Sequence, residues 1–288
     1  MRNEQEMMNL IMDTAKQDER ILAVFMNGSR ANPNAPKDIF QDYDIVYVVN
    51  ETASFIHDKQ WIDRFGERMI LQVPGEEQTN EEKASSYCWL MLFTDGNRID
   101  LQIQTPNYMK QHIHEESCCV VLLDKAGLLH DMPKTSDRTY WITPPTQERF
   151  TWVCNEFWWC LQNVAKGIWR NELTYALEML NTYVRPQLLS LLQWKAGIST
   201  NFTFSGGKSG KYLNKVLDEH EWNTYLMTFA GADVNLLNAI EVMMKQFHHT
   251  ANEIADKLGL HYNDVEATNM MQYVDHVFHL STKAKDIY

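Results

Sequence analysis

Several features are missing from this chain, and their absence limits where it can work. No apolar run approaches the ~20 residues that a bilayer crossing needs, and residues 1–20 are too charged to contain the apolar core of a signal peptide. The five cysteines are an odd number with no Cys-x-x-Cys pair, and most of them lie in apolar runs. Reduced, buried thiols are the state that this pattern favours. We therefore expect a soluble, cytoplasmic protein that does not bind a membrane.

Positive charge is also scarce. Lys and Arg number 26 against 38 Asp and Glu, so the formal net charge is −12. Proteins that bind nucleic acid usually present a basic face, and a nucleic acid is therefore not expected as a partner. An acidic surface raises the local concentration of a cationic substrate. Solubility alone is nevertheless the simpler explanation of the charge.

The chain does have enough apolar material for two domains. Hydrophobic residues make up 44% of its 288 residues, nine tryptophans included. Strands and helices are interspersed up to about residue 131, a polar linker bounded by Pro133, Pro144 and Pro145 follows, and the remaining pattern is almost entirely helical. We predict an α+β fold. Residues 1–134 form a domain with a mixed β-sheet flanked by helices, and residues 135–288 form an all-α helical bundle.

Hydrophobic periodicity and turn residues place the individual elements. Strands are expected at 21–26, 43–49, 68–73, 87–94, 98–104 and 118–123. Helices are expected at 4–17, 55–65, 146–167, 172–195 with a kink at Pro186, 211–219, 234–258 and 265–280. Asp95-Gly96-Asn97 predicts a hairpin between two strands. Residues 74–83 are polar and predict a mobile loop.

A pair of acids at the start of the expected strand 43–49 carries the strongest chemical signal. Asp42 and Asp44 are two residues apart, so their side chains project from the same face of a strand. Two adjacent carboxylates repel each other unless a cation lies between them. Hard oxygen ligands suit Mg²⁺, which completes its coordination shell with water and phosphate oxygens. The pair therefore indicates phosphoryl or nucleotidyl transfer.

A Gly28-Ser29 turn precedes the acid pair, with twelve residues between them. Such a turn can bring backbone N–H groups and a hydroxyl against phosphates. Arg30, beside the turn, is a second candidate for binding phosphate, unless it pairs with Asp38 or with Asp42.

These residues together resemble the nucleotidyltransferase superfamily that includes DNA polymerase β. Its pattern is an apolar strand ending in Gly-Ser, then Asp-x-Asp or Asp-x-Glu about a dozen residues later, then a third acid on a subsequent strand. Asp100, in the expected strand 98–104, fits the third place. The resemblance implies a two-metal site in which one ion accompanies the nucleotide phosphates and another lowers the pKa of the attacking hydroxyl. Asp100 is expected to bind the second metal, to accept the hydroxyl proton, or to do both.

The whole chain is more narrowly similar to the aminoglycoside 6-adenylyltransferases, the streptomycin-modifying enzymes of Gram-positive bacteria. Three runs carry the likeness: VFMNGSRANPNAPKDIFQDYDIVYVV, NRIDLQI and FSGGKSGKYLNKVL. The resemblance implies transfer of AMP from ATP to an aminoglycoside hydroxyl at the 6-position, with release of pyrophosphate and antibiotic resistance. It also implies that Gly28 and Ser29 hold the triphosphate, that Asp42, Asp44 and Asp100 form the catalytic and Mg²⁺-binding triad, and that the helical domain closes the substrate cleft.

The run FSGGKSGK at residues 204–211 is not a P-loop, because Phe202 stands where that motif requires its first glycine. It is better interpreted as a glycine-rich loop at a helix N-terminus, where N–H groups favour anions. Lys208 is the expected triphosphate contact, since Lys211 can already belong to the helix. A solvated surface loop is almost as good an interpretation.

The sequence indicates least clearly which residues contact the antibiotic whose hydroxyl accepts AMP. Trp152, Trp158, Trp159 and Trp194 are mostly expected in the core. Trp169 and Glu172 lie at the junction of two helices, where a ring and an acid suit a cationic, polyhydroxylated antibiotic. For Glu172 the structural role of a first-turn helix acid is the favoured interpretation. Glu82, in the polar segment, is a further candidate cation contact or a solvated loop residue.

Three alternatives remain beside streptomycin adenylylation. A related transferase would act on another aminoglycoside or on a lincosamide. A catalytically silent nucleotide-binding regulatory module would have no reason to keep three mutually repelling carboxylates. A nucleic-acid polymerase is disfavoured by the acidic balance. The expected partners are ATP and a cationic small-molecule antibiotic, and the chain is expected to be a monomer or a weak homodimer.

Overall fold

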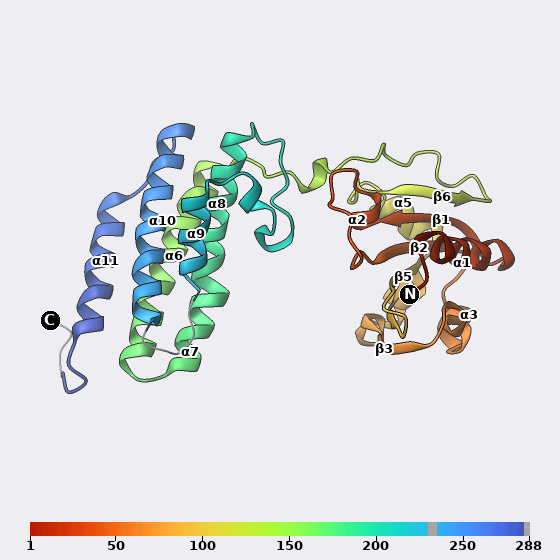
Figure 1. Ribbon diagram of the computed structural model, residues 1–288, viewed down its shortest axis with the longest axis horizontal. Coiled ribbons are helices and arrows are strands. Elements are labelled where there is room, and N and C mark those ends of the chain that lie inside the picture. Colours follow the sequence, from red (N-terminus) through yellow and green to blue (C-terminus); the bar gives the residue numbers. More distant parts are fainter. Residues whose placement is uncertain (230–234, 285–288) are drawn as a thin grey trace. The chain divides into compact units, whose positions relative to one another are not determined.

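A computed structural model describes residues 1–229 and 235–284 and divides the chain into two units, Met1–Thr139 (unit 1) and Tyr140–Tyr288 (unit 2). Unit 1 combines a β-sheet with helices, whereas the described part of unit 2 is helical (Figure 1). The predicted α+β fold class is confirmed. None of the helices in the described part of the chain has both the length and the apolar character that a membrane crossing requires.

Unit 1 is organised around a mixed sheet of six strands in the order β3-β4-β5-β2-β1-β6. The strands are β1 (Ile21–Asn27), β2 (Tyr43–Val49), β3 (Arg68–Gln72), β4 (Ser86–Phe93), β5 (Arg98–Gln104) and β6 (Val120–Asp124). β2 and β5 run parallel, and every other neighbouring pair is antiparallel. β4 and β5 form the hairpin that the Asp95-Gly96-Asn97 turn predicts.

Helices pack on both faces of this sheet. The helical segments between Glu4 and Tyr140 are α1 (Glu4–Gln17), α2 (Gly28–Ala31), α3 (Ala53–His57), the 3₁₀ turns η1 (Trp61–Phe65) and η2 (Pro74–Glu77), α4 (Asn80–Ser85), α5 (Pro106–His112) and the 3₁₀ turn η3 (Arg138–Tyr140), whose last residue belongs to unit 2. One face packs on α1 and η1 in a core that contains Ile45 and Leu101. On the opposite face Val46 packs with Met109 of α5 in a smaller core. Because side chains alternate along a strand, Asp44 and Asp100 fall on the α5 face.

Two segments of unit 1 differ from the sequence-based expectation. The helix expected at 55–65 is divided into α3 and η1, because the chain turns between them at Asp58. The loop expected at 74–83 contains η2 and α4. There Thr79 and Glu82 form a reciprocal capping box, a signal for the start of a helix that outweighs the polar composition.

The described part of unit 2 contains four long helices and several short helical segments. They are α6 (Gln147–Trp169), α7 (Leu173–Glu178), the π-helical segment η4 (Met179–Val184), α8 (Arg185–Ser199), the 3₁₀ turns η5 (Lys208–Gly210) and η6 (Leu213–Lys215), α9 (Glu219–Met227), α10 (Leu236–Leu258) and α11 (Asp264–His279). Their apolar faces share one core. Lys195 of α8 pairs with Glu221 of α9 and with Glu253 of α10, so one half-buried cation links three helices.

Three expectations for unit 2 need correction or refinement. The kink expected at Pro186 is a π-helical segment that ends just before it, because proline supplies no N–H to the preceding turn. The helix expected at 211–219 is wrong, since η6 occupies part of that stretch and α9 begins only at Glu219. Trp152 and Trp159 are exposed rather than buried, while Trp158 and Trp194 are in the core. The expected start of the next helix, Val234, lies outside the described residues.

Candidate active site

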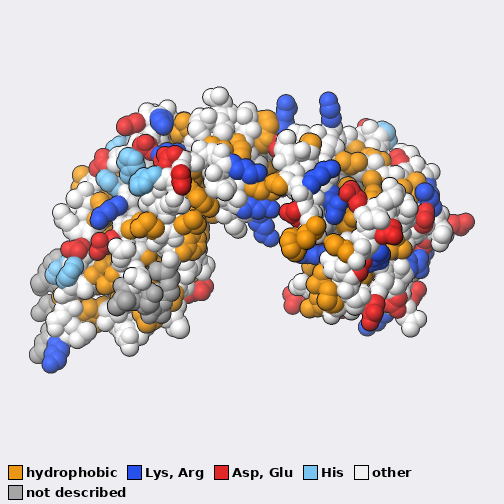
Figure 2. All heavy atoms as spheres, in the orientation of Figure 1, with side chains coloured by type: hydrophobic (Ala, Val, Ile, Leu, Met, Phe, Trp, Pro, Cys, Tyr) orange, Lys and Arg blue, Asp and Glu red, His pale blue; other side chains and the backbone are white. Residues whose placement is uncertain are grey.

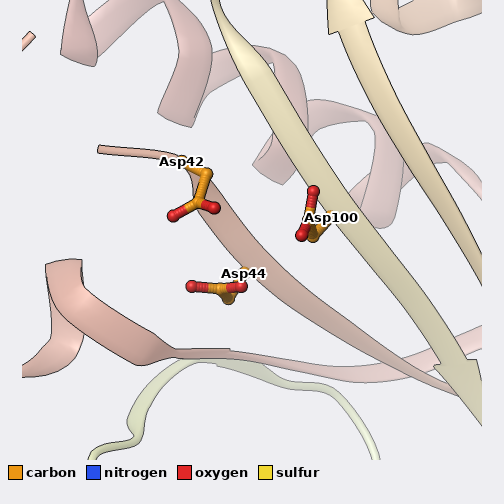
Figure 3. Close-up of side chains that lie close together, drawn as sticks. All are labelled: Asp42, Asp44 and Asp100. Atoms are coloured by element: carbon orange, nitrogen blue, oxygen red, sulfur yellow. The ribbon is translucent and has the colours of Figure 1, made fainter. Parts of the chain in front are cut away.

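Three carboxylates converge at one end of the sheet in unit 1. One oxygen each from Asp42, Asp44 and Asp100 lies within 4.8 Å of the other two, and Figure 3 shows the three side chains pointing toward a common space. Within residues 1–229 and 235–284 this is the only group of three or more His, Cys, Asp or Glu side chains arranged so closely. The structure thus brings together the three acids that the sequence singles out.

The parallel pairing of β2 and β5 explains the convergence. Asp44 lies directly opposite Asp100 in the register, so the two side chains leave the same face of the sheet side by side. Asp42 comes just before β2 and two residues before Asp44, which places it on that face as well. The geometry depends on strands far apart in sequence, and it places Asp100 on the same side of the sheet as the other two acids.

The electrostatics of the cluster fit a cation. Burial raises the pKa of Asp44 to about 7, and the charges of Asp42 and Asp100 push it in the same direction. Arg98 opposes this rise. A carboxylate whose pKa is raised this far, by burial first and by two acidic neighbours second, indicates that the cluster has too little positive charge for its three acids. Three carboxylate oxygens within this distance are the hard ligands that Mg²⁺ takes, with remaining positions left for water or phosphate.

Among the described residues, Arg98 places a positive charge beside the acid triad. Its Nε and Nη2 donate to the two oxygens of Asp100 at 2.7 and 2.6 Å, and its Nε lies 3.8 Å from Asp42 Oδ2. Arg98 is two residues before Asp100 on β5, hence on the same face. The guanidinium therefore neutralises part of the triad from its outer side. Sequence reasoning did not assign Arg98, although the Arg-x-Asp spacing within a strand was the signal that could have found it.

Gly28 lies against the triad. It begins α2 with φ +73°, and a Cβ built on it would lie 1.9 Å from Asp44 Oδ2. Only glycine fits there, because it tolerates this backbone conformation and has no side chain to collide with the carboxylate. Ser29 follows, and its Oγ accepts a hydrogen bond from Gln41 Nε2 at 3.3 Å. The Gly-Ser segment is thus next to the acids, as expected, although it starts a short helix rather than an isolated turn.

Arg30 has contacts that hold the loop before β2. Its Nε and Nη2 donate to the backbone oxygens of Asp42 and Gln41, both at 3.0 Å, and its guanidinium lies 3.9 Å from the centre of the Tyr43 ring. A further contact of 3.7 Å joins Nη1 to Glu4. The partner is therefore the backbone of Asp42, not its carboxylate and not Asp38. In this structure Arg30 positions the first acid.

Lys208 belongs to unit 2 and has an exposed side chain at the start of η5. The sequence predicts that this loop leads directly into a helix, but the loop is followed by the 3₁₀ turns η5 and η6. Gly207, Ser209 and Gly210 all have positive φ, which interrupts helical geometry. The run is therefore a glycine-rich loop followed by 3₁₀ turns, and Lys208 remains accessible on it.

The three candidate acceptor contacts lie apart from the triad in sequence and differ in their surroundings. Trp169, also in unit 2, packs against the helical core and donates from Nε1 to the Leu280 oxygen at 3.2 Å. Glu172 precedes α7 with an exposed side chain that makes no capping bond. Glu82, in unit 1, accepts hydrogen bonds from Thr79 and closes the capping box of α4. Trp169 and Glu82 thus have structural contacts of their own.

Metal binding to this cluster should depend on pH through Asp44. Its pKa of about 7 exceeds the ordinary value near 4, so between these values the folded protein holds a proton that the unfolded chain has released. The contribution of this proton to the free energy of unfolding is fully present below pH 4 and is lost as the pH rises through about 7. Added Mg²⁺ should therefore raise the unfolding temperature more at pH 8 than at pH 5.5, where it must displace the proton.

Thermal unfolding with and without Mg²⁺ at the two pH values checks this expectation. The variant Asp44→Asn is the control, and Mg²⁺ should change its unfolding temperature little at either pH value. An equal increase of the unfolding temperature at pH 5.5 and pH 8 in the unmodified chain would rule out Asp44 as the titrating ligand.

Comparisons with known proteins agree over nearly the full chain. A family model described as streptomycin adenylyltransferase matches residues 1–277. A curated protein from Bacillus subtilis (strain 168), named aminoglycoside 6-adenylyltransferase, is 35% identical over 275 residues, which is 92% of this chain and 95% of the relative. Another of that name from Campylobacter jejuni is 35% identical over 91% of each chain.

A third relative of that name, from Staphylococcus aureus, is 35% identical over 80% of this chain and 82% of its own length. Among solved structures, the crystal structure of an aminoglycoside 6-adenyltransferase from Bacillus subtilis matches with 30% identity, a TM-score of 0.48, and coverage of 97% of this chain and 100% of that one.

Proposed function

The chain belongs to the streptomycin adenylyltransferase family, and we propose that it transfers AMP from ATP to a hydroxyl of an aminoglycoside antibiotic, releasing pyrophosphate. Streptomycin, modified at the 6-position, is the substrate we propose. The observation that carries the proposal is the convergence of Asp42, Asp44 and Asp100 beside Gly28, within a chain whose relatives share the name aminoglycoside 6-adenylyltransferase. Because the reaction consumes ATP, we place it in the cytoplasm.

In this proposal Asp42, Asp44 and Asp100 hold Mg²⁺, and Asp100 also serves the acceptor. When bound, Mg²⁺ would neutralise charge on the triphosphate and lower the pKa of the attacking hydroxyl. Asp100 accepts the hydroxyl proton while the oxygen forms a bond to the α-phosphorus, and the bond from that phosphorus to the bridging oxygen breaks to release pyrophosphate. Arg98, which hydrogen-bonds both oxygens of Asp100, must free one of them for this step.

The remaining residues position ATP. Gly28 and Ser29 bring the backbone at the start of α2 against the triphosphate, while Arg30 keeps Asp42 in place through its backbone oxygen. Contact of Lys208, on the glycine-rich loop 204–211, with the triphosphate stays a prediction from the sequence. Unlike Glu82, Glu172 makes no capping hydrogen bond with its carboxylate. We therefore propose Glu172 as a contact for a cationic antibiotic.

Mass spectrometry of streptomycin incubated with the protein, ATP and Mg²⁺ tests the proposal. We expect a product heavier by one AMP unit, with pyrophosphate formed in equal amount. A panel of other aminoglycosides and a lincosamide should be assayed alongside. An adduct found only on another compound would change the substrate but retain the chemistry. Binding of ATP without transfer to any compound would contradict the enzymatic proposal and favour a silent nucleotide-binding module.

A further inference from the structure

A cavity of about 180 Å³ opens in unit 1 next to the acid triad. It lies between the α5 face of the sheet, helix α5 and the segment that follows this helix. Its lining includes Asn27, Gln102, Tyr108, His112, Glu115 and Glu116. At about 30 Å³ per water, the space corresponds to about six waters and suits one substituted ring.

Strand register connects this cavity to the triad. Asn27 of β1 lies opposite Asp44, and Gln102 is two residues after Asp100 on β5, so both side chains continue the face that carries the acids. Gln102 is in turn opposite Val46. A ring held in the cavity would therefore have its edge at the carboxylates, where the reacting hydroxyl has to be.

The charges of the lining favour a cation. Glu115 and Glu116 both contribute, whereas none of the lining residues is Lys or Arg. An anionic group such as a triphosphate would meet two carboxylates there and neither Lys nor Arg. Glu116 is held in place by Cys118, whose backbone N–H donates to Glu116 Oε1 at 2.7 Å. The carboxylate is thus a fixed group of the cavity.

Two amides provide hydrogen-bond acceptors for the donors of such a cation. Asn27 Oδ1 is buried, yet it has no hydrogen-bond partner among the residues that the structure describes. A buried polar atom left without a partner is costly and indicates a missing ligand or water. Gln102 donates from Nε2 to Ser86 Oγ at 2.8 Å, which fixes its amide plane and leaves its oxygen to accept from a ligand.

An aromatic surface completes the cavity. The rings of Tyr108 and His112, one turn apart on α5, lie with their centres 4.3 Å from each other and their planes tilted by 33°. A tyrosine face attracts guanidinium and ammonium groups. The stack also offers a flat surface to the apolar side of a sugar or cyclitol ring.

We propose that this cavity is the acceptor subsite, which receives the guanidinium or ammonium group of the ring whose hydroxyl takes the AMP, with Glu116 as its anionic partner and the Asn27 and Gln102 oxygens as its hydrogen-bond acceptors. The inference rests on the proposed function and names the part of that site that selects a cationic acceptor. ATP then binds on the other side of the triad, toward Gly28 and Ser29.

The isosteric variant Glu116→Gln tests the subsite, because its amide oxygen can still accept from Cys118. A charged hydrogen bond contributes enough that its loss should raise the KM for streptomycin about ten- to a hundredfold. The KM for ATP should stay within about twofold of the parent value. Glu19→Gln, exposed and outside the cavity, makes the same change of net charge and should alter neither constant. Gln102→Met should raise the streptomycin KM less, since it removes a neutral acceptor.

Calorimetric titration with streptomycin in the absence of ATP separates this inference from the proposed function. Weaker binding in Glu116→Gln than in the unmodified chain supports the subsite even if no AMP transfer is observed. Turnover of streptomycin with unchanged constants in Glu116→Gln overturns the subsite and leaves the function standing. A higher KM for ATP alone assigns the cavity to the nucleotide and also overturns it. No binding and no turnover by the unmodified chain overturns both.

Discussion

Replacing Asp44 with asparagine should reduce AMP transfer by more than about a hundredfold, since losing even an outer partner of a metal ligand costs about 10–100-fold. The amide keeps the size of the side chain but removes the charge that a divalent cation requires. Asp42→Asn should have an effect of similar size, because we propose both acids as ligands of the same cation. The rate of pyrophosphate release with streptomycin and ATP measures both losses.

The fold should survive these changes. Burial and two neighbouring carboxylates already disfavour the charge of Asp44 and raise its pKa to about 7, so a neutral amide relieves repulsion in the protein without metal. We therefore expect an unfolding temperature equal to or above that of the parent above pH 7. Asp13→Asn, exposed on α1, is the matched control and should keep full activity. Activity near the parent level in either Asp42→Asn or Asp44→Asn would remove the metal-site argument.

The second large effect is expected from Gly28→Ala. The added methyl group would lie 1.9 Å from Asp44 Oδ2, so either the carboxylate or the start of α2 must move. A displacement of about 1 Å in a reacting constellation can cost about a hundredfold in rate, and we expect a loss of kcat of that order. The positive φ of +73° adds a conformational penalty of about 1–2 kcal/mol to folding.

Gly127→Ala separates these two contributions. Gly127 has a similar φ of +64°, but a Cβ there would meet nothing within 4 Å. This variant should show the conformational penalty in thermal unfolding and keep its activity. If Gly28→Ala retains activity comparable to that of Gly127→Ala, glycine is required at position 28 only for its backbone conformation. The proximity of Gly28 to Asp44 would then not affect catalysis.

The acid triad was predictable because its signals are local and additive. A two-residue spacing on a strand places Asp42 and Asp44 on one face, and Asp100 lies in an equally regular strand. The spacing of these residues does not predict that β2 pairs with β5. That pairing aligns Asp44 with Asp100 across more than fifty residues of sequence and follows from the order of the strands in the sheet.

Other features were missed where long-range contacts decide the structure. The strand face that carries Gln102 was readable, but its proximity to α5, and hence the cavity, depends on how the helix returns over the sheet. The loop at Lys208 was expected to start a helix, and its three positive φ angles were not visible in the periodicity. A phosphate contact of Arg30 stays a prediction, and the sequence did not indicate the contacts that its donors make with the backbone before β2.

The visible surface of unit 1 carries side chains of both charges. On its visible face, acidic side chains lie interspersed with Lys and Arg (Figure 2). Within unit 1, carboxylates gather at the triad and at the neighbouring cavity. The local arrangement of carboxylates therefore says more about the proposed chemistry than the net charge of −12 does.

A titration of the protein with Mn²⁺, followed by electron paramagnetic resonance at pH 8 without ATP or antibiotic, tests the central claim directly. Convergence of the three carboxylates on one cation predicts a bound signal in the unmodified chain that is strongly reduced in Asp42→Asn, in Asp44→Asn and in Asp100→Asn. The same Mn²⁺ affinity in the unmodified chain and in all three variants would contradict it.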